Sequence, residues 1–414
     1  MTRRVVITGT GLVTPIGNDV GATWSAIREG RSGAGPITQF DASDHEVRFA
    51  CEVKDFDPTL YIERKEVKRT DRYAQFAIAA ASQAMTEAGL GDGLNGVDPA
   101  RLGVIIGSGI GGINTFEEQH RKMLEKGPTR ISPFFVPMFI SDIAAGLVSI
   151  RYGAKGPNYA PVSACATGAH AIGNAARTIQ AGDADIVIAG GAEASVTPMA
   201  IGGFASMKAL SERNDSPETA SRPFDADRDG FVLGEGSGVV VVESLEHAQA
   251  RGAHIIAEVA GYGQSADAYH MTAPAEGGVG AQLSMRLALE DAGVAPEEVD
   301  YVNAHGTSTP ANDKNETSAI KAVLGERARE IVVGSTKSMT GHLLGAAGGV
   351  ETIICALACR DGYIPRTINY ETPDPNCDLD YATESGVDRE VSVALSNSFG
   401  FGGHNVALVV RRWN

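Results

Sequence analysis

A short glycine-rich pattern occurs twice in this chain, each time where a predicted strand is followed by a predicted helix. Residues 166–176 are ATGAHAIGNAA and residues 339–347 are MTGHLLGAA, and the two align with one short gap. A strand, a tight turn and a helix form one βα unit, and glycine suits the turn because it adopts backbone angles that other residues avoid. The repeat therefore predicts a duplicated α/β fold in which sheets alternate with helices in layers.

The other hydrophobic runs alternate between short apolar stretches typical of strands and longer stretches of helical periodicity. Predicted strands cover residues 5–13, 102–106, 184–189, 238–243, 255–259, 299–303 and 331–334. Predicted helices cover residues 71–88, 114–126, 171–181, 280–292 and 316–323. The alternation begins again near residue 250, and 414 residues exceed one ordinary core, so we expect two similar halves, 1–250 and 251–414.

Charge and hydropathy exclude two classes of partner. The net charge of −16 argues against nucleic acid, because binding to phosphates needs a basic surface. No apolar run is long enough to cross a membrane, and no signal-like segment precedes the first predicted strand. We therefore expect a cytoplasmic protein that binds neither nucleic acid nor membrane.

The five cysteines form no CxxC pair and no spacing typical of disulfides. Cys355 and Cys359 lie four residues apart on one face of an apolar helix, downstream of His342. A metal site would need further ligands at usable spacing, so we interpret the two cysteines as core residues and expect no metal.

Cys165 is the candidate nucleophile. It lies in a segment of small residues, 162–170, on the turn that opens the predicted helix 171–181. Backbone N–H groups and the positive end of the helix dipole favour a thiolate there, and such settings lower a cysteine pKa from about 8.5 to roughly 3.5–7.5. The small neighbours leave room for a substrate to approach the sulfur. A buried structural cysteine is the alternative that this pattern leaves open.

Three further glycine-rich loops carry residues suited to catalysis. Residues 303–310 place His305 just past a strand, residues 334–342 place Lys337 and His342 before a helix, and residues 397–405 form a loop with Phe401 at its tip. Functional residues of α/β proteins gather in loops that follow strands. A cysteine, a lysine and two histidines in such loops therefore indicate nucleophilic and acid–base chemistry.

Together these stretches resemble the elongating β-ketoacyl-acyl carrier protein synthases, and most of all synthase II of bacterial fatty acid synthesis. The resemblance is carried by Ala164–Gly168, Arg222–Asp225, Arg228–Val232, Asn303–Pro310, Lys337–His342 and Gly400–Gly403. These motifs occur in the family's order over almost the whole chain. One residue departs from the family pattern, because His404 stands where many relatives have threonine.

The resemblance implies the thiolase fold, a duplicated five-layered αβαβα sandwich, and a homodimer. It implies that Cys165 accepts an acyl chain from acyl carrier protein as a thioester. His305 and His342, as neutral imidazoles, would bind a malonyl thioester and stabilise the enolate formed as CO2 leaves. The enolate would attack the acyl-cysteine and release a chain two carbons longer. No cofactor is implied, since phosphopantetheine arrives on the carrier protein.

Further residues take roles from the family by resemblance. Backbone N–H groups of Cys165 and Phe401 would form the oxyanion hole, and Thr307 and Thr309 would hold the pantetheine arm. Lys337, paired with Glu351 or Glu316, would fix His342 and discourage a positive charge on it. Residues that would line or gate the acyl pocket are Ile110, Phe204, Leu344 and Phe401, with Phe135 reaching it from the partner subunit. Residues that would dock the acidic carrier protein are Arg64, Lys65, Lys68, Arg69, Arg130 and Lys208.

Four other functions share part of this pattern. A polyketide ketosynthase has the same catalytic residues and a different substrate, whereas a non-catalytic chain-length subunit usually lacks the cysteine. Residues Gly107–Gly112 satisfy the G-x-G-x-x-G pattern after a predicted strand, which is typical of NAD-dependent oxidoreductases. A thiol hydrolase would need a cysteine and one histidine only. The lysine and the second histidine favour the condensing enzyme.

Overall fold

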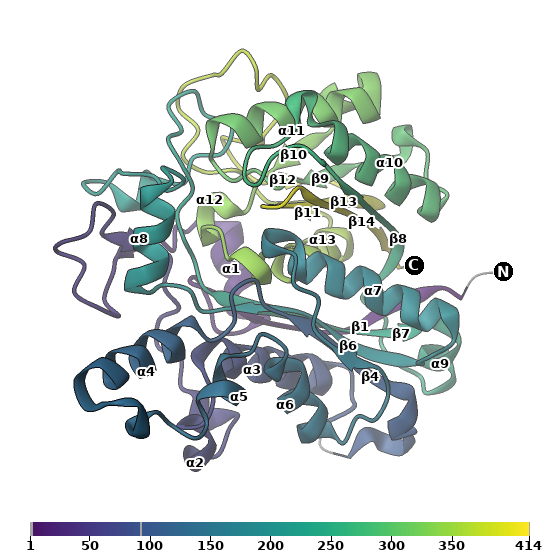
Figure 1. Ribbon diagram of the computed structural model, residues 1–414. Helices are drawn as coiled ribbons and strands as arrows, with labels where there is room; N and C mark the ends of the chain where they lie inside the picture. Colours follow the sequence, from purple (N-terminus) through teal and green to yellow (C-terminus); the bar gives the residue numbers. More distant parts are fainter. Residues whose placement is uncertain (1–2, 92, 414) are drawn as a thin grey trace.

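The computed structural model describes residues 3–91 and 93–413, and its largest feature is a mixed sheet of ten strands (Figure 1). These strands are β1 (Val5–Val13), β4 (Leu102–Gly107), β5 (Asn158–Tyr159), β6 (Ile186–Glu193), β7 (Gly236–Ser244), β8 (Ala257–Ala266), β9 (Tyr301–Asn303), β10 (Val332–Gly334), β13 (Val393–Gly400) and β14 (His404–Arg412). Two small sheets pair β2 (Gly35–Pro36) with β3 (Phe49–Ala50) and β11 (Tyr363–Ile364) with β12 (Val387–Asp388).

The α-helices of the described residues follow the strands in alternation. They are α1 (Val20–Glu29), α2 (Arg64–Val67), α3 (Arg72–Glu87), α4 (Ile113–Lys126), α5 (Phe135–Phe139), α6 (Ile143–Tyr152), α7 (Thr167–Ala181), α8 (Pro198–Ser206), α9 (Leu245–Ala250), α10 (Val279–Ala292), α11 (Pro310–Leu324), α12 (Lys337–Thr340) and α13 (Ala347–Asp361). The predicted strands and helices all appear among these elements. Most ends differ by a few residues, but β8 extends well past the predicted end at residue 259 and α11 begins at Pro310, ahead of the predicted start at residue 316.

The ten-stranded sheet consists of two halves with the same connectivity. The strand order is β5-β4-β6-β7-β1 from the first part of the chain and β10-β9-β13-β14-β8 from the second. In both halves the first three strands of this order are parallel, and the last two pair antiparallel to their neighbours. The halves join where β1 pairs with β8, through Val6 with Glu258 and Ile7 with Ala257. The two sheets expected from the sequence are therefore one continuous sheet.

Helices cover both faces of each half-sheet and produce five layers (Figure 1). Helices α3 and α6 cover the outer face of the first half, and α10 and α11 lie outside the second. Helices α7 and α13 pack against each other in the middle layer, between the two half-sheets. This is the expected thiolase fold, a duplicated αβαβα sandwich.

The middle layer is held together by glycines on facing sides of α7 and α13. A Cβ atom at Gly168 would lie 2.7 Å from the Gly349 nitrogen, and one at Gly348 would lie 2.5 Å from the Ala169 nitrogen. Separations under about 3 Å are too short for a carbon atom, so only glycine permits this approach. The close contact brings the turns that open the two helices to one place.

The structure corrects the alignment of the glycine-rich repeat. A three-residue 3-10 turn precedes each central helix: Ala164–Ala166 before α7 and Leu344–Ala346 before α13. Gly345 therefore occupies the position of Cys165 in the second half, whereas the sequence alignment had paired Thr340 and Gly341 with the start of α7. That pairing is wrong because Gly341, with φ 69°, ends the separate short helix α12.

We expect Gly349→Ala to destabilise the protein by about 1–3 kcal/mol, as overpacking a tight interface does. A Cβ atom there would lie 2.2 Å from the Gly238 carbonyl oxygen, so the backbone of α13 must shift. The midpoint of thermal unfolding measures the effect. Gly202→Ala in α8 is the matched control, because no atom lies within 4 Å of its added Cβ. An equal midpoint for the two variants would contradict the tight packing.

Candidate active site

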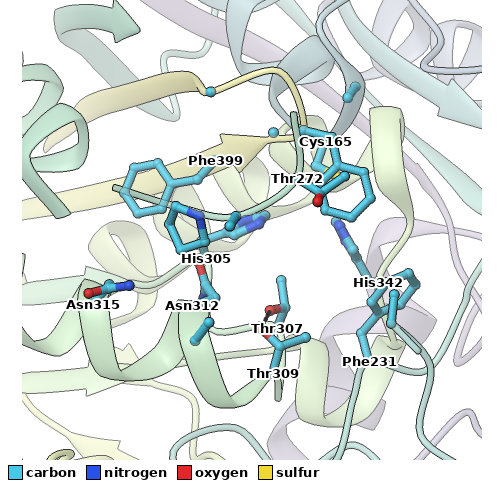
Figure 2. Close-up of a pocket in the computed structure, with 18 of the residues that line it drawn as sticks. Cys165, Phe231, Thr272, His305, Thr307, Thr309, Asn312, Asn315, His342 and Phe399 are labelled. Atoms are coloured by element: carbon cyan, nitrogen blue, oxygen red, sulfur yellow. Dashed lines mark hydrogen bonds between the residues drawn. The ribbon is translucent and has the colours of Figure 1, made fainter. Parts of the chain in front are cut away.

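A cavity of about 550 Å³ lies between the second half-sheet and the turns that open the central helices, and Figure 2 shows side chains that line it. Cys165, His305 and His342 all border this cavity, although they come from three distant parts of the chain. The structure therefore brings together the candidate nucleophile and both histidines that the sequence singled out.

Cys165 lies in the 3-10 turn that leads directly into α7. The residue before it, Ala164, has φ 49°, a left-handed backbone angle that costs roughly 1–2 kcal/mol for a residue with a Cβ. The end of β13 packs against this turn: a Cβ atom at Gly400 would lie 2.6 Å from the Ser163 carbonyl oxygen. The end of β13 thus helps to fix the strained turn, which holds Cys165 at the cavity wall.

The protonation of Cys165 differs from the state expected from the helix alone. Burial raises the pKa of the Cys165 thiol to about 12. The positive charge of Lys337 and the backbone N–H of Phe401 act in the opposite direction and favour the thiolate, but by less than burial disfavours it. The prediction that the Cys165 pKa falls below about 8.5 is wrong for the free enzyme. That prediction rested on the helix dipole and the backbone N–H groups, whereas the loss of water around the buried sulfur has the larger effect.

The two histidine rings lie edge to face, with centroids 5.3 Å apart and planes at 86°. Burial lowers the pKa of both His305 and His342 well below the usual value, and the charge of Lys337 lowers both further. Both imidazoles are therefore neutral near pH 7, as expected, although burial and not the lysine is the larger cause. A neutral imidazole carries one N–H donor.

Lys337 is buried behind the cavity at the start of α12 and forms an ion pair with Glu351 of α13. Burial raises the pKa of Glu351 to about 7, and the lysine opposes this rise. Of the two partners expected for Lys337, Glu351 is therefore the correct one. Glu316 accepts hydrogen bonds from the backbone N–H groups of His305 and Gly306, both at 2.8 Å, and so fixes the loop that carries His305.

Most of the other residues expected at the site also line the cavity. They are Ile110, Phe204, Thr307, Thr309, Glu316, Leu344 and Phe401. The hydroxyl groups of Thr307 and Thr309 are hydrogen-bonded to each other at 3.0 Å. Phe135 does not line the cavity of its own subunit, since it lies on α5 with its ring 5.8 Å from that of Phe139. Its contribution to the pocket of a partner subunit stays a prediction.

Comparison with known proteins identifies the family. The beta-ketoacyl synthase N-terminal domain family matches residues 2–248, and the beta-ketoacyl synthase C-terminal domain family matches residues 256–371. The chain belongs to the beta-ketoacyl synthase family. The resemblance inferred from the sequence motifs is therefore confirmed.

Individual relatives cover the chain from end to end. It is 54% identical to the 3-oxoacyl-[acyl-carrier-protein] synthase 2 of Synechocystis sp. over 411 residues, which cover 99% of this chain and 98% of the relative. It is equally identical to the enzyme of the same name from Staphylococcus aureus, with 99% of each chain covered. Among solved structures, a type II PKS acyl-carrier protein in complex with its ketosynthase bound to the hexaketide contains a chain with a TM-score of 0.93 and 38% identity, with full coverage of both chains.

The glycine-rich loop 107–112 has a different role in this family member from the one its pattern suggested. The backbone N–H groups of Gly109 and Ile110 donate to the buried carboxylate of Glu193, at 2.8 and 3.2 Å. The N–H of Gly112 donates to the Phe139 carbonyl. A protein carboxylate thus occupies these donors, which a dinucleotide phosphate would need. The interpretation of Gly107–Gly112 as a dinucleotide site is wrong.

The sequence analysis missed three residues of the site. The Phe231 ring lies 5.2 Å from the His342 ring, and the Phe399 ring lies 5.6 Å from the His305 ring. Both stand inside motifs that were noticed for other residues. Glu193 also accepts a hydrogen bond from Gly345 and so ties the two cavity walls together, and no sequence motif pointed to it.

The residues expected to dock the carrier protein are all exposed. Lys208 alone among them lines the cavity, and its ammonium group is paired with Glu46 at 2.6 Å and Glu212 at 3.2 Å. The basic segment formed by Arg64, Lys65, Lys68 and Arg69 lies in and after α2, below the first half-sheet in Figure 1. Arg130 lies beyond α4.

Residues 3–91 and 93–413 contain neither a candidate metal site nor a candidate membrane-spanning helix. Within these residues, no three histidine, cysteine, aspartate or glutamate side chains lie close enough together to hold a metal ion. Their helices also include none with the length and apolar character needed to span a bilayer.

We expect Cys165 to react first with iodoacetamide, because it alone of the five cysteines lines the cavity. Since burial raises the pKa of Cys165 to about 12, the thiolate fraction and the alkylation rate should rise about tenfold per pH unit between pH 7 and 9. Mass mapping of the labelled peptides against time measures both. First labelling at Cys377, or a rate that is level with pH, would contradict the assignment.

Proposed function

We propose that this chain is an elongating β-ketoacyl-acyl carrier protein synthase of fatty acid biosynthesis. The observation that carries the proposal is the convergence of Cys165, His305 and His342 on one cavity of a chain that is 54% identical to enzymes named 3-oxoacyl-[acyl-carrier-protein] synthase 2. The reaction is a decarboxylative Claisen condensation between an acyl chain on the cysteine and a malonyl thioester.

The first half-reaction is acyl transfer to Cys165. The cysteine sulfur attacks the carbonyl carbon of the acyl thioester, the carrier's carbon–sulfur bond breaks, and the carrier thiol takes the proton that the cysteine loses. Lys337 and the backbone N–H of Phe401 favour the thiolate during this step, because both lower the thiol pKa. The N–H groups of Cys165 and Phe401 form the oxyanion hole, and each such donor typically contributes about 3–4 kcal/mol.

The second half-reaction is decarboxylation and condensation. The bond between the malonyl carboxylate and its α-carbon breaks, CO2 leaves, and the electron pair passes into the thioester enolate. His305 and His342 are neutral, and each donates an N–H hydrogen bond to the enolate oxygen. The α-carbon then attacks the acyl carbonyl, the bond to Cys165 breaks, and the sulfur takes up a proton as the β-ketoacyl chain leaves, two carbons longer.

Other parts of the cavity position the substrates. Thr307 and Thr309 hold the pantetheine arm, while Ile110, Phe204, Leu344 and Phe401 form the wall against which the acyl chain packs. Lys337 and its partner Glu351 hold α12 and α13 together beside His342. The protein itself supplies no cofactor, since phosphopantetheine belongs to the carrier.

We propose acyl carrier protein as the partner and a homodimer as the working form, in the cytoplasm. A solved relative is a ketosynthase in complex with an acyl-carrier protein, which supports the first proposal. The second is supported by the edge strand β5 and by exposed apolar side chains along α4, α5 and the segment after β5, among them Phe116, Val136 and Val162. Docking through the basic segment at α2, and the division of the chain at residue 250, stay predictions.

The main alternative is a polyketide ketosynthase. The solved polyketide relative is 38% identical, whereas the relatives named synthase 2 are 54% identical over the same length. The difference favours fatty acid elongation.

Incubation with acyl carrier proteins that bear saturated chains of several lengths, together with malonyl carrier protein, tests the function. We expect β-ketoacyl products two carbons longer than each accepted primer, identified by mass spectrometry. A protein that takes only β-polyketone primers, or that releases free acids, would be a polyketide synthase or a thiol hydrolase instead.

We expect His305→Ala and His342→Ala to abolish CO2 release from malonyl carrier protein while Cys165 still becomes acylated. Each removes one donor to the enolate, a loss of about a hundredfold or more in rate. His→Gln at either position should retain more activity, since an amide keeps an N–H donor. Cys165→Ala is the matched control and should still release CO2, because the thiol takes no part in decarboxylation. Loss of CO2 release in this control, with retention in both histidine variants, would reverse the assignment of roles.

A further inference from the structure

The mechanism described above assigns no role to the motif between Arg222 and Val232. The contacts of this motif indicate a role. Residues 222–230, here named the anchor segment, pack against residues 308–310 of the loop that carries Thr307 and Thr309. The Arg222 backbone N–H donates to the Ser308 hydroxyl at 3.0 Å, and the Gly230 N–H donates to the Ser308 carbonyl at 3.1 Å. Ser308, the residue between Thr307 and Thr309, is thus held through both its side chain and its backbone.

Arg228 makes the largest contribution to this contact. Its Nε donates to the Thr309 carbonyl at 3.2 Å, and its Nη2 donates to the Pro310 carbonyl at 3.1 Å. Its Nη1 donates to the Asp374 carboxylate at 2.7 Å, and the buried carboxylate of Asp313 lies 3.6 Å from Nε. The Arg228 side chain is only 4% exposed, so its planar fork is fixed by these acceptors.

The anchored loop is strained and would not keep its shape alone. Ser308 has φ 71°, a left-handed angle that a residue with a Cβ seldom adopts without support from its surroundings. The side chains of Thr307 and Thr309 line the cavity and lie between those of His305 and His342 in Figure 2, with their hydroxyl groups hydrogen-bonded to each other. The anchor segment therefore fixes the part of the loop that faces the substrate arm.

The catalytic end of the same loop has a separate support. His305 and Gly306 are held by the Glu316 carboxylate through their backbone N–H groups, and the Gly306 carbonyl accepts a hydrogen bond from Ser335 at 2.7 Å. None of these contacts involves the anchor segment. Loss of the anchor should thus move the threonines more than the histidine.

We infer that Arg228 is a positioning residue for substrate binding: it holds Thr307 and Thr309 where they bind the pantetheine arm of the malonyl thioester. This inference rests on the proposed function. A contact to the non-reacting arm is made equally in the bound substrate and in the transition state, so its loss raises KM and leaves kcat nearly unchanged.

The test is steady-state kinetics of Arg228→Lys with malonyl carrier protein at saturating acyl donor. Lysine keeps the charge and loses the planar fork. We expect KM to rise about tenfold, equivalent to about 1.4 kcal/mol, with kcat within about threefold of wild type. The alkylation rate of Cys165 by iodoacetamide should stay unchanged, because the sulfur lies on a different turn.

Arg213→Lys is the matched control. Arg213 also binds the anchor segment, through the Asp227 carbonyl at 2.7 Å. It is more exposed than Arg228, and its hydrogen-bond and ion-pair partners do not include the loop 305–310. Its substitution should leave KM unchanged. Glu316→Gln is the opposite case, since it loosens the histidine end of the loop, and should lower kcat more than it raises KM.

Unchanged KM in Arg228→Lys would overturn the inference, and so would a parallel fall of kcat and of Cys165 alkylation, which indicates general loss of structure. If Arg228→Lys does not fold, Ser308→Ala decides, because it removes only the hydroxyl that Arg222 binds. We then expect KM to rise about threefold, and an unchanged KM overturns the inference. Failure of the wild-type protein to condense these substrates would instead refute the proposed function.

Discussion

The close contact between α7 and α13 is the constraint on which the site depends. Glycines at 168, 348 and 349 let the backbones of the two helices and the adjacent strands approach to distances that no other residue would permit. The turns that open these helices carry Cys165 in one half and its counterpart Gly345 in the other. The duplicated fold thus provides two equivalent turns at one place. One turn holds the proposed nucleophile, and in the other the Gly345 N–H donates a hydrogen bond to Glu193.

Buried charge around the cavity serves two purposes. The carboxylates of Glu193 and Glu316 accept hydrogen bonds from backbone N–H groups and so hold the cavity loops in place. Burying a carboxylate costs free energy because it loses its hydration, and these hydrogen bonds offset part of that cost. The ammonium group of Lys337 instead acts through its field. It adds to the effect of burial in disfavouring protonation of both histidines. At Cys165 it favours the thiolate and so opposes the larger effect of burial.

Local patterns predicted much of this structure, and long-range packing determined the rest. The strands, the helices and the position of Cys165 on a helix-opening turn follow from neighbours in sequence, and so they were predictable. The choice of Glu351 over Glu316 for Lys337 depends on which helix lies beneath α12, which no local pattern encodes. For the same reason the glycine loop at 107–112 left a dinucleotide site open as an alternative, because Glu193 reaches this loop from another strand.

The pairing of β1 with β8 determines how substrates can reach the cavity. Enzymes with a site between two structural halves often open by rotation about a hinge. Here such a rotation would break the hydrogen bond from the Ile256 N–H to the Ile7 carbonyl, 2.9 Å, and separate the glycine faces of the central helices. Opening is therefore left to peripheral chain segments, such as residues 267–275, whose Met271 carbonyl accepts the N–H of Gly402 beside the cavity. Asp267, Thr272, Ala273 and Pro274 of this segment line the cavity from outside the continuous sheet. We therefore expect substrate exchange to require movement of this segment and not of the two half-sheets.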